Sequence, residues 1–357
     1  MESKMKMLID RVVRALASRK LDCLLVSDQA NISYLTGFKS RDAWLLVTPE
    51  QNIYFTDGRY TEEASKALKG ITLHKINKTA SEEIASVCKK KGLQKIGFEE
   101  HYVSWLFHSK LSEKLPKGAH LAPAGTIIED FRKIKSAREL LLIRKAVSIA
   151  CAAMEFAATQ LLPGKREIEI AAEIERFIRI RGASASSFEI IVASGPHTSR
   201  PHHATSSRRL RLGEPVIIDL GAEYLGYKSD LTRTFFLGKI TPLFKKVYTI
   251  VIEAQKRAFA AIRPQVFVNT VDACARQIIS KKGYGGFFNH SLGHGVGLEV
   301  HEAPHVSQKN QNELLKQGMV FTVEPGIYLP GRFGVRIEDM IVVTRKGCEV
   351  LSGSLNK

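Results

Sequence analysis

Four acidic residues in the second half of the chain lie in or beside strand-like runs of apolar residues. They are Asp219 at the end of 216–220, Asp230 at the start of 230–237, Glu324 at the end of 319–324 and Glu338 within 334–344. Acidic side chains are depleted in strands, and a buried carboxylate must be protonated, paired with a cation or bound to a metal ion. The fold must therefore bring a partner to each of these carboxylates.

The two aspartates are eleven positions apart, on either side of a connection that contains glycine. Strands joined by a short connection pair antiparallel, so Asp219 and Asp230 are expected to face each other in one sheet. Their negative charges would repel unless a cation lay between them. The alternative is that both aspartates serve turns at the strand ends.

A second unusual segment is rich in histidine and glycine. Four of the 11 histidines fall within residues 290–305, and glycines flank His294 on both sides. Glycine lets a backbone approach a ligand closely, which favours a site at His294, whereas an exposed histidine-rich loop is the alternative. For Glu338 the alternative partner is Arg336, because residues two apart in a strand project from the same face.

Together these positions offer four carboxylates and one imidazole: Asp219, Asp230, His294, Glu324 and Glu338. Hard oxygen donors in this proportion suit two divalent ions of the manganese, magnesium, cobalt or iron type, bridged by shared carboxylates and a water. A single tetrahedral structural zinc would leave at least one acid without a partner. The joint pattern predicts a dinuclear metal centre and is more specific than any one residue.

The chain has 357 residues, which is too long for one compact core and suits two domains. Up to about residue 128, short strand-like runs alternate with amphipathic helical stretches, which predicts a small α/β domain. The runs are 21–27, 43–47, 53–56, 71–76 and 95–98. A connector that starts at 123–125 leads to the expected domain bounds of 1–130 and 131–357.

The second domain is predicted to be α+β, because strands and helix pairs mix there without strict βαβ alternation. Ser136 and Glu139 form a capping-box pattern at the start of a long helix, and Pro163 and Gly164 follow its end. The expected helices are 136–162, 167–181, 243–262 and 270–282, and a strand at 189–193 joins those that carry the acidic residues.

The formal net charge of +17 would fit nucleic acid, acidic membranes or anionic substrates and does not choose among them. Because the basic residues are spread along the chain, we expect a solvated basic surface and no nucleic-acid partner. Five scattered cysteines without a C-x-x-C pair indicate reduced thiols. The start of the chain lacks an apolar targeting segment and no apolar run approaches ~18 residues, so a cytoplasmic protein that does not span a membrane is predicted.

Five segments surround the candidate ligands: Val-Ile-Ile-Asp219-Leu-Gly-Ala, Ser-Asp230-Leu-Thr-Arg-Thr, Gly-His294-Gly-Val-Gly-Leu-Glu-Val-His301-Glu-Ala-Pro, Val-Glu324-Pro-Gly-Ile-Tyr328 and Gly-Val-Arg336-Ile-Glu338-Asp. They resemble the signatures of the metal-dependent aminopeptidase family with the pita-bread fold, in its prolidase-like branch. The first part of the chain is similar to the creatinase-type N-domain of that branch, notably over residues 31–38. The resemblance implies a creatinase-like domain at 1–130, a pita-bread catalytic domain at 131–357, and two metal ions held by the five ligands.

The resemblance also assigns roles to other residues. His202, which follows Pro201, matches the histidine that binds substrate and relays a proton, and the adjacent His203 is a rival for that role. We expect Glu324 to take the proton of the attacking water. Three further residues are expected in the pocket: His301 beside the scissile carbonyl oxygen or the leaving proline, Arg336 near the last ligand, and Tyr328 as a hydrogen-bonding group.

The function implied by the resemblance is that of a metallo-exopeptidase. Hydrolysis of the bond before proline in small peptides, with release of the N-terminal residue, would make it an Xaa-Pro aminopeptidase. An Xaa-Pro dipeptidase, or prolidase, is the alternative, and the complete ligand set disfavours a metal-free module that binds protein or nucleic acid. Manganese is the expected metal, with cobalt or zinc as alternatives, and the resemblance implies a homodimer.

Overall fold

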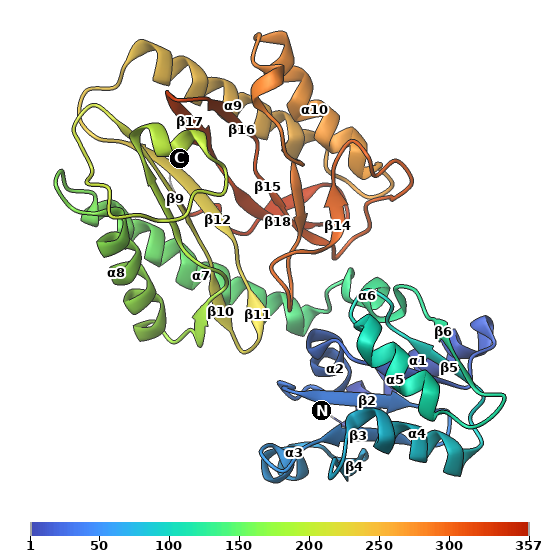
Figure 1. Ribbon diagram of the computed structural model, residues 1–357. Coiled ribbons are helices and arrows are strands. Elements are labelled where there is room, and N and C mark those ends of the chain that lie inside the picture. Colours follow the sequence, from blue (N-terminus) through green and yellow to red (C-terminus); the bar gives the residue numbers. More distant parts are fainter. Residues whose placement is uncertain (1, 356–357) are drawn as a thin grey trace. The chain divides into compact units, whose positions relative to one another are not determined.

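The computed structural model describes residues 2–355, with side chains described from residue 5 onward. The chain divides into two compact units, with the boundary between Arg132 and Lys133 (Figure 1). Both units contain helices and strands, so neither part of the chain is all-α or all-β.

The N-terminal unit contains one six-stranded sheet with the strand order β4-β3-β2-β1-β5-β6. Its strands are β1 (Cys23–Val26), β2 (Ala43–Val47), β3 (Asn52–Thr56), β4 (Thr72–Lys75), β5 (Lys95–Phe98) and β6 (His120–Pro123). β1 pairs antiparallel with β2 and parallel with β5, so the sheet is mixed. The five predicted strands are confirmed, whereas β6 was missed because Leu121 is its one large apolar side chain.

Six helices belong to this unit: α1 (Glu2–Arg19), α2 (Gln29–Thr36), α3 (Thr61–Ala67), α4 (Ala80–Lys91), α5 (Trp105–Lys114) and α6 (Ile127–Arg132). The core of the unit joins the sheet to α4, since Leu25, Phe55 and Ile84 belong to one buried cluster. Asn31 in α2 is fully buried and donates hydrogen bonds to Glu99 and Glu129. The segment 31–38 therefore helps to hold the N-terminal unit together.

The C-terminal unit contains four long helices, which confirm the four predicted from the sequence. They are α7 (Ala137–Gln160), α8 (Glu167–Ile180), α9 (Pro242–Ala261) and α10 (Val268–Lys281). The predicted capping box is present, because the Ser136 side chain accepts from the Glu139 amide and the Glu139 carboxylate accepts from the Ser136 amide. Two short 3₁₀ helices, η1 (Gly195–Ser199) and η2 (Gly285–Phe287), accompany them.

The strands of the C-terminal unit form four small sheets with the orders β11-β10-β7, β12-β9-β8, β14-β13-β15-β18-β19 and β16-β17. The strands are β7 (Ala185–Ser186), β8 (Ile191–Ser194), β9 (Pro215–Leu220), β10 (Ala222–Tyr224), β11 (Tyr227–Lys228), β12 (Leu231–Phe236), β13 (Gly293–Gly295), β14 (Glu302–Val306), β15 (Val320–Val323), β16 (Gly326–Leu329), β17 (Phe333–Arg336), β18 (Asp339–Val343) and β19 (Cys348–Val350). The α+β character of this unit is thus confirmed.

Two buried clusters cover different parts of these sheets. One joins α7 and α8 to β8, β9 and β12, and the other joins α9 and α10 to β15, β16, β17 and β18. Figure 1 shows these helix pairs on opposite sides of the unit, with the strands between them. The strands that carry the acidic residues are therefore shielded by helices on both sides.

One predicted strand is wrong. The run 334–344 is divided into β17 and β18, which belong to different sheets and are separated by Ile337 and Glu338. The sequence does not reveal such a break, because Arg336, Glu338 and Asp339 interrupt the run but are buried like the apolar residues on either side. The break places Glu338 between two strands rather than within one.

Candidate metal centre

The pairing of β9 with β12 brings the two aspartates to one place. The strands run antiparallel with Asp219 opposite Thr232, and Asp230 directly precedes β12, so the predicted pairing is confirmed. Gly221 lets the backbone after β9 approach the backbone at Ser229, because a Cβ atom at position 221 would lie 1.9 Å from the carbonyl oxygen of Ser229. The connection between them is the hairpin β10–β11.

His294 comes from β13 and is nine-tenths buried. Its Nδ1 donates a hydrogen bond to the carbonyl oxygen of Gly295 at 3.2 Å, which leaves the lone pair of Nε2 free. Nε2 lies 3.6 Å from Asp230 Oδ2 and 3.4 Å from Glu324 Oε1. Burial lowers the pKa of His294 to about 4, so the imidazole is neutral at pH 7 and able to bind a metal ion.

The two glutamates stand where strands end. Glu324 directly follows β15, and its Oε1 accepts a hydrogen bond of 3.1 Å from the hydroxyl of Thr322. Glu338 lies between β17 and β18, and its Oε2 accepts a hydrogen bond of 2.7 Å from the hydroxyl of Thr232. A neighbouring threonine thus orients each carboxylate while leaving an oxygen for another partner.

The five predicted ligands converge on one region. Ligand atoms of Asp230, His294 and Glu338 all lie within 4.8 Å of one another. Burial, reinforced by the negative charges of the surrounding carboxylates, raises the pKa values of Asp230 and Glu338 well above the ordinary range. Burial also raises the pKa of Glu324 to about 8, against the opposing charge of Arg336 and with Asp219 adding to the rise.

The site has more buried carboxyl groups than its cationic side chain can pair. Asp219 Oδ1 is buried and has no hydrogen-bond partner among residues 2–355. Arg336 supplies one positive charge against four carboxylates. Divalent cations would relieve both deficiencies, so the residues fit metal ions, which would be held by Asp219, Asp230, His294, Glu324 and Glu338.

Arg336 is buried and fully engaged in hydrogen bonds. Its guanidinium donates to Asp219 Oδ2 at 2.7 Å, Thr232 Oγ1 at 3.0 Å, Tyr328 Oη at 3.0 Å and the carbonyl oxygen of Pro201 at 3.1 Å. The ion pair considered for Glu338 is therefore wrong, since Arg336 pairs with Asp219. Residues 336 and 338 do not share one strand face, because the break at Ile337 and Glu338 removes the alternation of a continuous strand.

His290 joins this network, although the sequence analysis gave it no role. Its Nδ1 donates to the carbonyl oxygen of Ser291, so its Nε2 accepts from the Tyr328 hydroxyl at 3.0 Å. Burial, with the nearby charge of Arg336, lowers the pKa of His290 to about 4. Membership of the histidine-rich run 290–305 was the signal that could have identified it.

The two neighbouring histidines of segment 201–203 have different surroundings. His202 is exposed and lies close enough to His290 and His301 to contribute, after burial, to the lowered pKa values of both. The ring of His301 lies 4.2 Å from that of His294, measured between centroids. His301 thus lies beside the acidic cluster, and His202 lies near His301.

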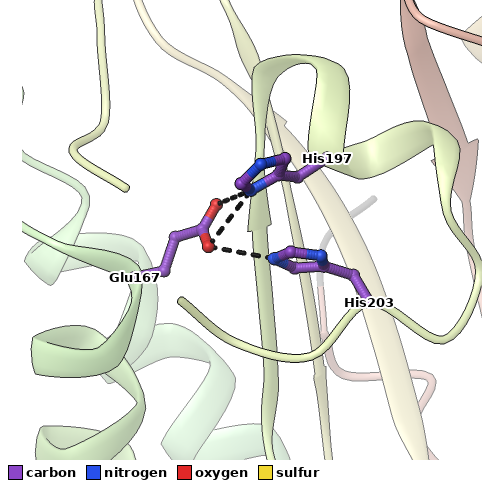
Figure 2. Close-up of side chains that lie close together, drawn as sticks. All are labelled: Glu167, His197 and His203. Atoms are coloured by element: carbon purple, nitrogen blue, oxygen red, sulfur yellow. Dashed lines mark hydrogen bonds and ion pairs between the residues drawn. The ribbon is translucent and has the colours of Figure 1, made fainter. Parts of the chain in front are cut away.

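His203, by contrast, is buried and directed to another carboxylate. Its Nε2 lies 3.0 Å from Glu167 Oε2, and Figure 2 shows both His203 and His197 pointing toward Glu167. Glu167 begins α8 and also accepts hydrogen bonds from Ser194 and Ser206. The structure therefore does not bring His203 to the acidic cluster.

Comparison with known proteins agrees with this geometry. Residues 142–345 match the family described as metallopeptidase family M24, and residues 9–134 match the creatinase/prolidase N-terminal domain. The chain belongs to metallopeptidase family M24. This M24 peptidase is 37% identical over 349 residues to a protein named Xaa-Pro dipeptidase from Pyrococcus horikoshii, with 96% of each chain covered.

Solved structures show the same family. An Xaa-Pro dipeptidase from Bacillus anthracis superimposes with a TM-score of 0.94 at 38% identity, with 99% of both chains covered. An X-Pro aminopeptidase from Thermotoga maritima superimposes with a TM-score of 0.86 at 34% identity, covering 95% of this chain and 97% of the other. The M24 peptidase has the pita-bread fold expected from the sequence and is a metallo-exopeptidase.

Across residues 2–355, none of the helices has both the length and the apolar character that a membrane crossing requires.

Proposed function

We propose that this M24 peptidase is an Xaa-Pro dipeptidase, which hydrolyses the peptide bond before proline in dipeptides. The observation that carries the proposal is the convergence of four carboxylates and the neutral His294 on one buried region. The relatives named Xaa-Pro dipeptidase, at 36–37% identity over nearly the whole chain, supply the substrate class.

The proposed metal ligands are Asp219, Asp230, His294, Glu324 and Glu338. Two bound divalent ions would supply Lewis acidity, which lowers the pKa of a water molecule and polarises the scissile carbonyl. Four oxygen-donating side chains and one imidazole favour manganese, and cobalt and zinc are the alternatives for activity assays.

The side chains around the ligands would handle protons and orient the peptide. Glu324, which lies 3.4 Å from His294 and is oriented by the hydroxyl of Thr322, would take the proton of the attacking water. The nitrogen of proline in an Xaa-Pro bond carries no hydrogen, so its departure needs a proton from a positioned acid. We assign that proton to His202, which is exposed and acts electrostatically on His301.

His301 would donate a hydrogen bond to the oxyanion that forms on the scissile carbonyl, which is a preorganised electrostatic role. Arg336 and Tyr328 would position other residues and would not contact the substrate. Arg336 donates hydrogen bonds to Tyr328, to Asp219 and to the carbonyl oxygen of Pro201. The last of these bonds fixes the residue next to His202 relative to the metal ligands. His203 would have no contact with substrate, since it is bonded to Glu167.

A dipeptidase also needs a cation for the carboxylate of its product, proline. Arg336 is already engaged by four acceptors and is unsuitable. Arg200 and Arg332 are exposed, and we propose them as candidates for binding this carboxylate. The second candidate function is the Xaa-Pro aminopeptidase first expected, which the similarity to the Thermotoga maritima enzyme favours.

Parallel assays decide between the two functions. Xaa-Pro and Xaa-Pro-Xaa substrates should be compared with Mn²⁺, Co²⁺ and Zn²⁺ added separately to metal-depleted protein. A dipeptidase should have a kcat/KM at least ten-fold higher for Xaa-Pro, which corresponds to about 1.4 kcal/mol of preference. Equal or faster cleavage of the tripeptide would establish the aminopeptidase, and no metal-dependent hydrolysis of either would refute both.

Two further features of the protein are part of this proposal. We propose a homodimer and a cytoplasmic location, and all five cysteines are free, as a reducing compartment would permit. Light scattering coupled to size-exclusion chromatography measures the first, and fractionation of cells that contain the protein measures the second.

A further inference from the structure

A second group of metal-binding side chains lies apart from the ligands assigned above. Glu167 is fully buried at the start of α8, His203 is buried, and His197 in η1 has about 23% of its side chain exposed. Figure 2 shows the two imidazoles converging on the same carboxylate. We name these three residues the Glu167–His197–His203 cluster.

The distances in the cluster are those of ligands around a single ion. Glu167 Oε2 lies 3.0 Å from His203 Nε2 and 3.4 Å from His197 Nδ1, and ligand atoms of all three lie within 4.8 Å of one another. A tetrahedral zinc ion with bonds of about 2.0–2.1 Å holds its ligand atoms roughly 3.3 Å apart. The two distances to the carboxylate already match this spacing, and the imidazoles would draw together to close the three around one ion.

The carboxylate is held in position by other groups. Ser194 donates to Oε1 from its amide at 2.8 Å and its hydroxyl at 2.7 Å, while Ser206 donates to Oε2 at 3.1 Å and 2.6 Å. Hydrogen bonds of this kind orient metal-binding carboxylates and would persist when an ion displaced the two histidine donors. The nearby positive charge of Arg208 is balanced by two bonds to Glu214, at 2.7 and 2.8 Å.

We propose that the Glu167–His197–His203 cluster is a second, mononuclear metal site. It would bind a divalent transition ion through two imidazoles and one carboxylate, with solvent as the fourth ligand on the exposed side of His197. This donor set favours zinc, nickel or copper over manganese, whereas the oxygen-rich dinuclear centre favours manganese. The two sites therefore differ in the metal that they select.

Binding requires that each histidine present a lone pair to the ion. The nitrogen that now donates to Glu167 would give up its hydrogen, and the other ring nitrogen would carry it, so a neutral imidazole stays neutral. The ion would link α8 to both ends of the segment 197–203. Since His202 precedes His203, occupation would hold more firmly the segment that carries the proposed proton donor.

A direct metal count tests the site without reference to activity. Manganese-loaded wild-type protein and the His197→Phe variant should be dialysed against Zn²⁺, and bound zinc then measured by atomic emission. The phenylalanine ring keeps the contact with the His203 ring, which lies 4.3 Å away, and removes the coordinating nitrogen. Zinc that enters the dinuclear centre counts equally in both proteins, so the wild type should bind one more ion per chain.

Further variants separate loss of a ligand from loss of the fold. His203→Phe should also lose one zinc, whereas His120→Phe, at an exposed position of the N-terminal unit, should lose none. Zinc should raise the melting temperature of the wild type more than that of His197→Phe, and the melting curve without zinc shows whether each variant is folded. Equal zinc counts in wild type and folded His197→Phe would overturn the proposal, whether or not the protein cleaves Xaa-Pro dipeptides.

Discussion

A buried carboxylate that repels its neighbours can be removed without harming the fold. Asp230→Asn keeps the shape of the side chain and removes one carboxyl group from a cluster in which burial and the neighbouring acids raise the pKa of Asp230. We expect kcat/KM on Xaa-Pro to fall by at least about 100-fold, because a metal ligand is weakened. The melting temperature of the metal-free variant should equal or exceed that of the wild type.

Metal analysis and thermal melting should accompany the kinetics of Asp230→Asn. Asp10→Asn is a suitable control, since Asp10 is exposed on α1 of the N-terminal unit. The control should retain metal and activity. Full turnover and a full metal complement in Asp230→Asn would show that this residue is no ligand.

The two adjacent histidines should respond in opposite ways to substitution. His202→Ala removes an exposed imidazole and should lower kcat/KM by about 100-fold or more, as expected for a general acid, with an unchanged free energy of unfolding. His203→Ala leaves Glu167 without one of its donors and should reduce the free energy of unfolding by about 1–3 kcal/mol. Urea unfolding and steady-state kinetics on both variants test this, and a reversal of the two outcomes would exchange their roles.

At single residues, the sequence predicted the convergence of the ligands but not their contacts. Buried acids are conspicuous among apolar residues, so Asp219 and Asp230 could be found from composition and register alone. The choice between His202 and His203 could not be made, because it depends on the direction in which each side chain leaves a loop. The histidine-rich run marked His290 as a candidate, but its hydrogen bond to Tyr328 could not be predicted, since it depends on contact with a strand far along the chain.

The strand pair that carries the aspartates depends on one position without a side chain. A Cβ atom at Gly221 would meet the carbonyl oxygen of Ser229 at 1.9 Å. Gly221→Ala must therefore separate β9 from the residues before β12, at a cost of about 3 kcal/mol or more, and should displace Asp219 from Asp230.

The measurements for Gly221→Ala are the urea midpoint and the number of bound metal ions. Gly286→Ala offers a matched control, because no heavy atom lies within 4 Å of a Cβ atom built there. The control should unfold within about 1 kcal/mol of the wild type. Comparable stability of the two variants would contradict the role given to the close contact.

Helices were predicted more accurately than strands, for a local reason. The start of α7 is defined by the capping box of Ser136 and Glu139, which is visible in four consecutive residues. The break between β17 and β18 has no such signal, since it contains neither glycine nor proline and Ile337 and Glu338 are as buried as the strands on either side. Short strands such as β13, with the sequence Gly-His-Gly, lack an apolar pattern altogether and are set by their partners.

For the whole molecule, metal removal should make stability depend on pH. Burial and mutual repulsion raise the pKa of Glu324 to about 8, and they raise the pKa values of Asp230 and Glu338 well above their ordinary range. In the unfolded chain these carboxyls titrate near pH 4. The metal-free folded state therefore holds extra protons at neutral pH, and its stability must fall as the pH rises from about 4.5 through 8.

Melting curves of chelator-treated protein between pH 5.5 and 8.5 test this dependence. The melting temperature should decrease toward pH 8.5, and saturating Mn²⁺ should largely remove the slope because bound cations replace the protons. Asp230→Asn should show a smaller slope than the wild type without metal. A flat profile in the metal-free wild type would show that the four carboxylates are not in mutual contact.

For the whole molecule, the sequence predicted an α/β part and an α+β part, but not what the basic surface binds. The pattern of the sequence changes near residue 130, and the chain divides into compact units between Arg132 and Lys133. The net charge of +17 remains without a structural explanation. Charge alone cannot supply one, because spread-out basic residues have no preferred partner.

The guanidinium of Arg336 has a consequence for how the enzyme can change over time. One side chain bonds both Asp219 and the carbonyl oxygen next to His202. A substitution that displaces Asp219 is therefore expected also to shift His202, the proposed proton donor to the leaving amine. Directed evolution toward new substrates should therefore recover paired substitutions, one near Asp219 and one near Pro201, more often than single substitutions at either place.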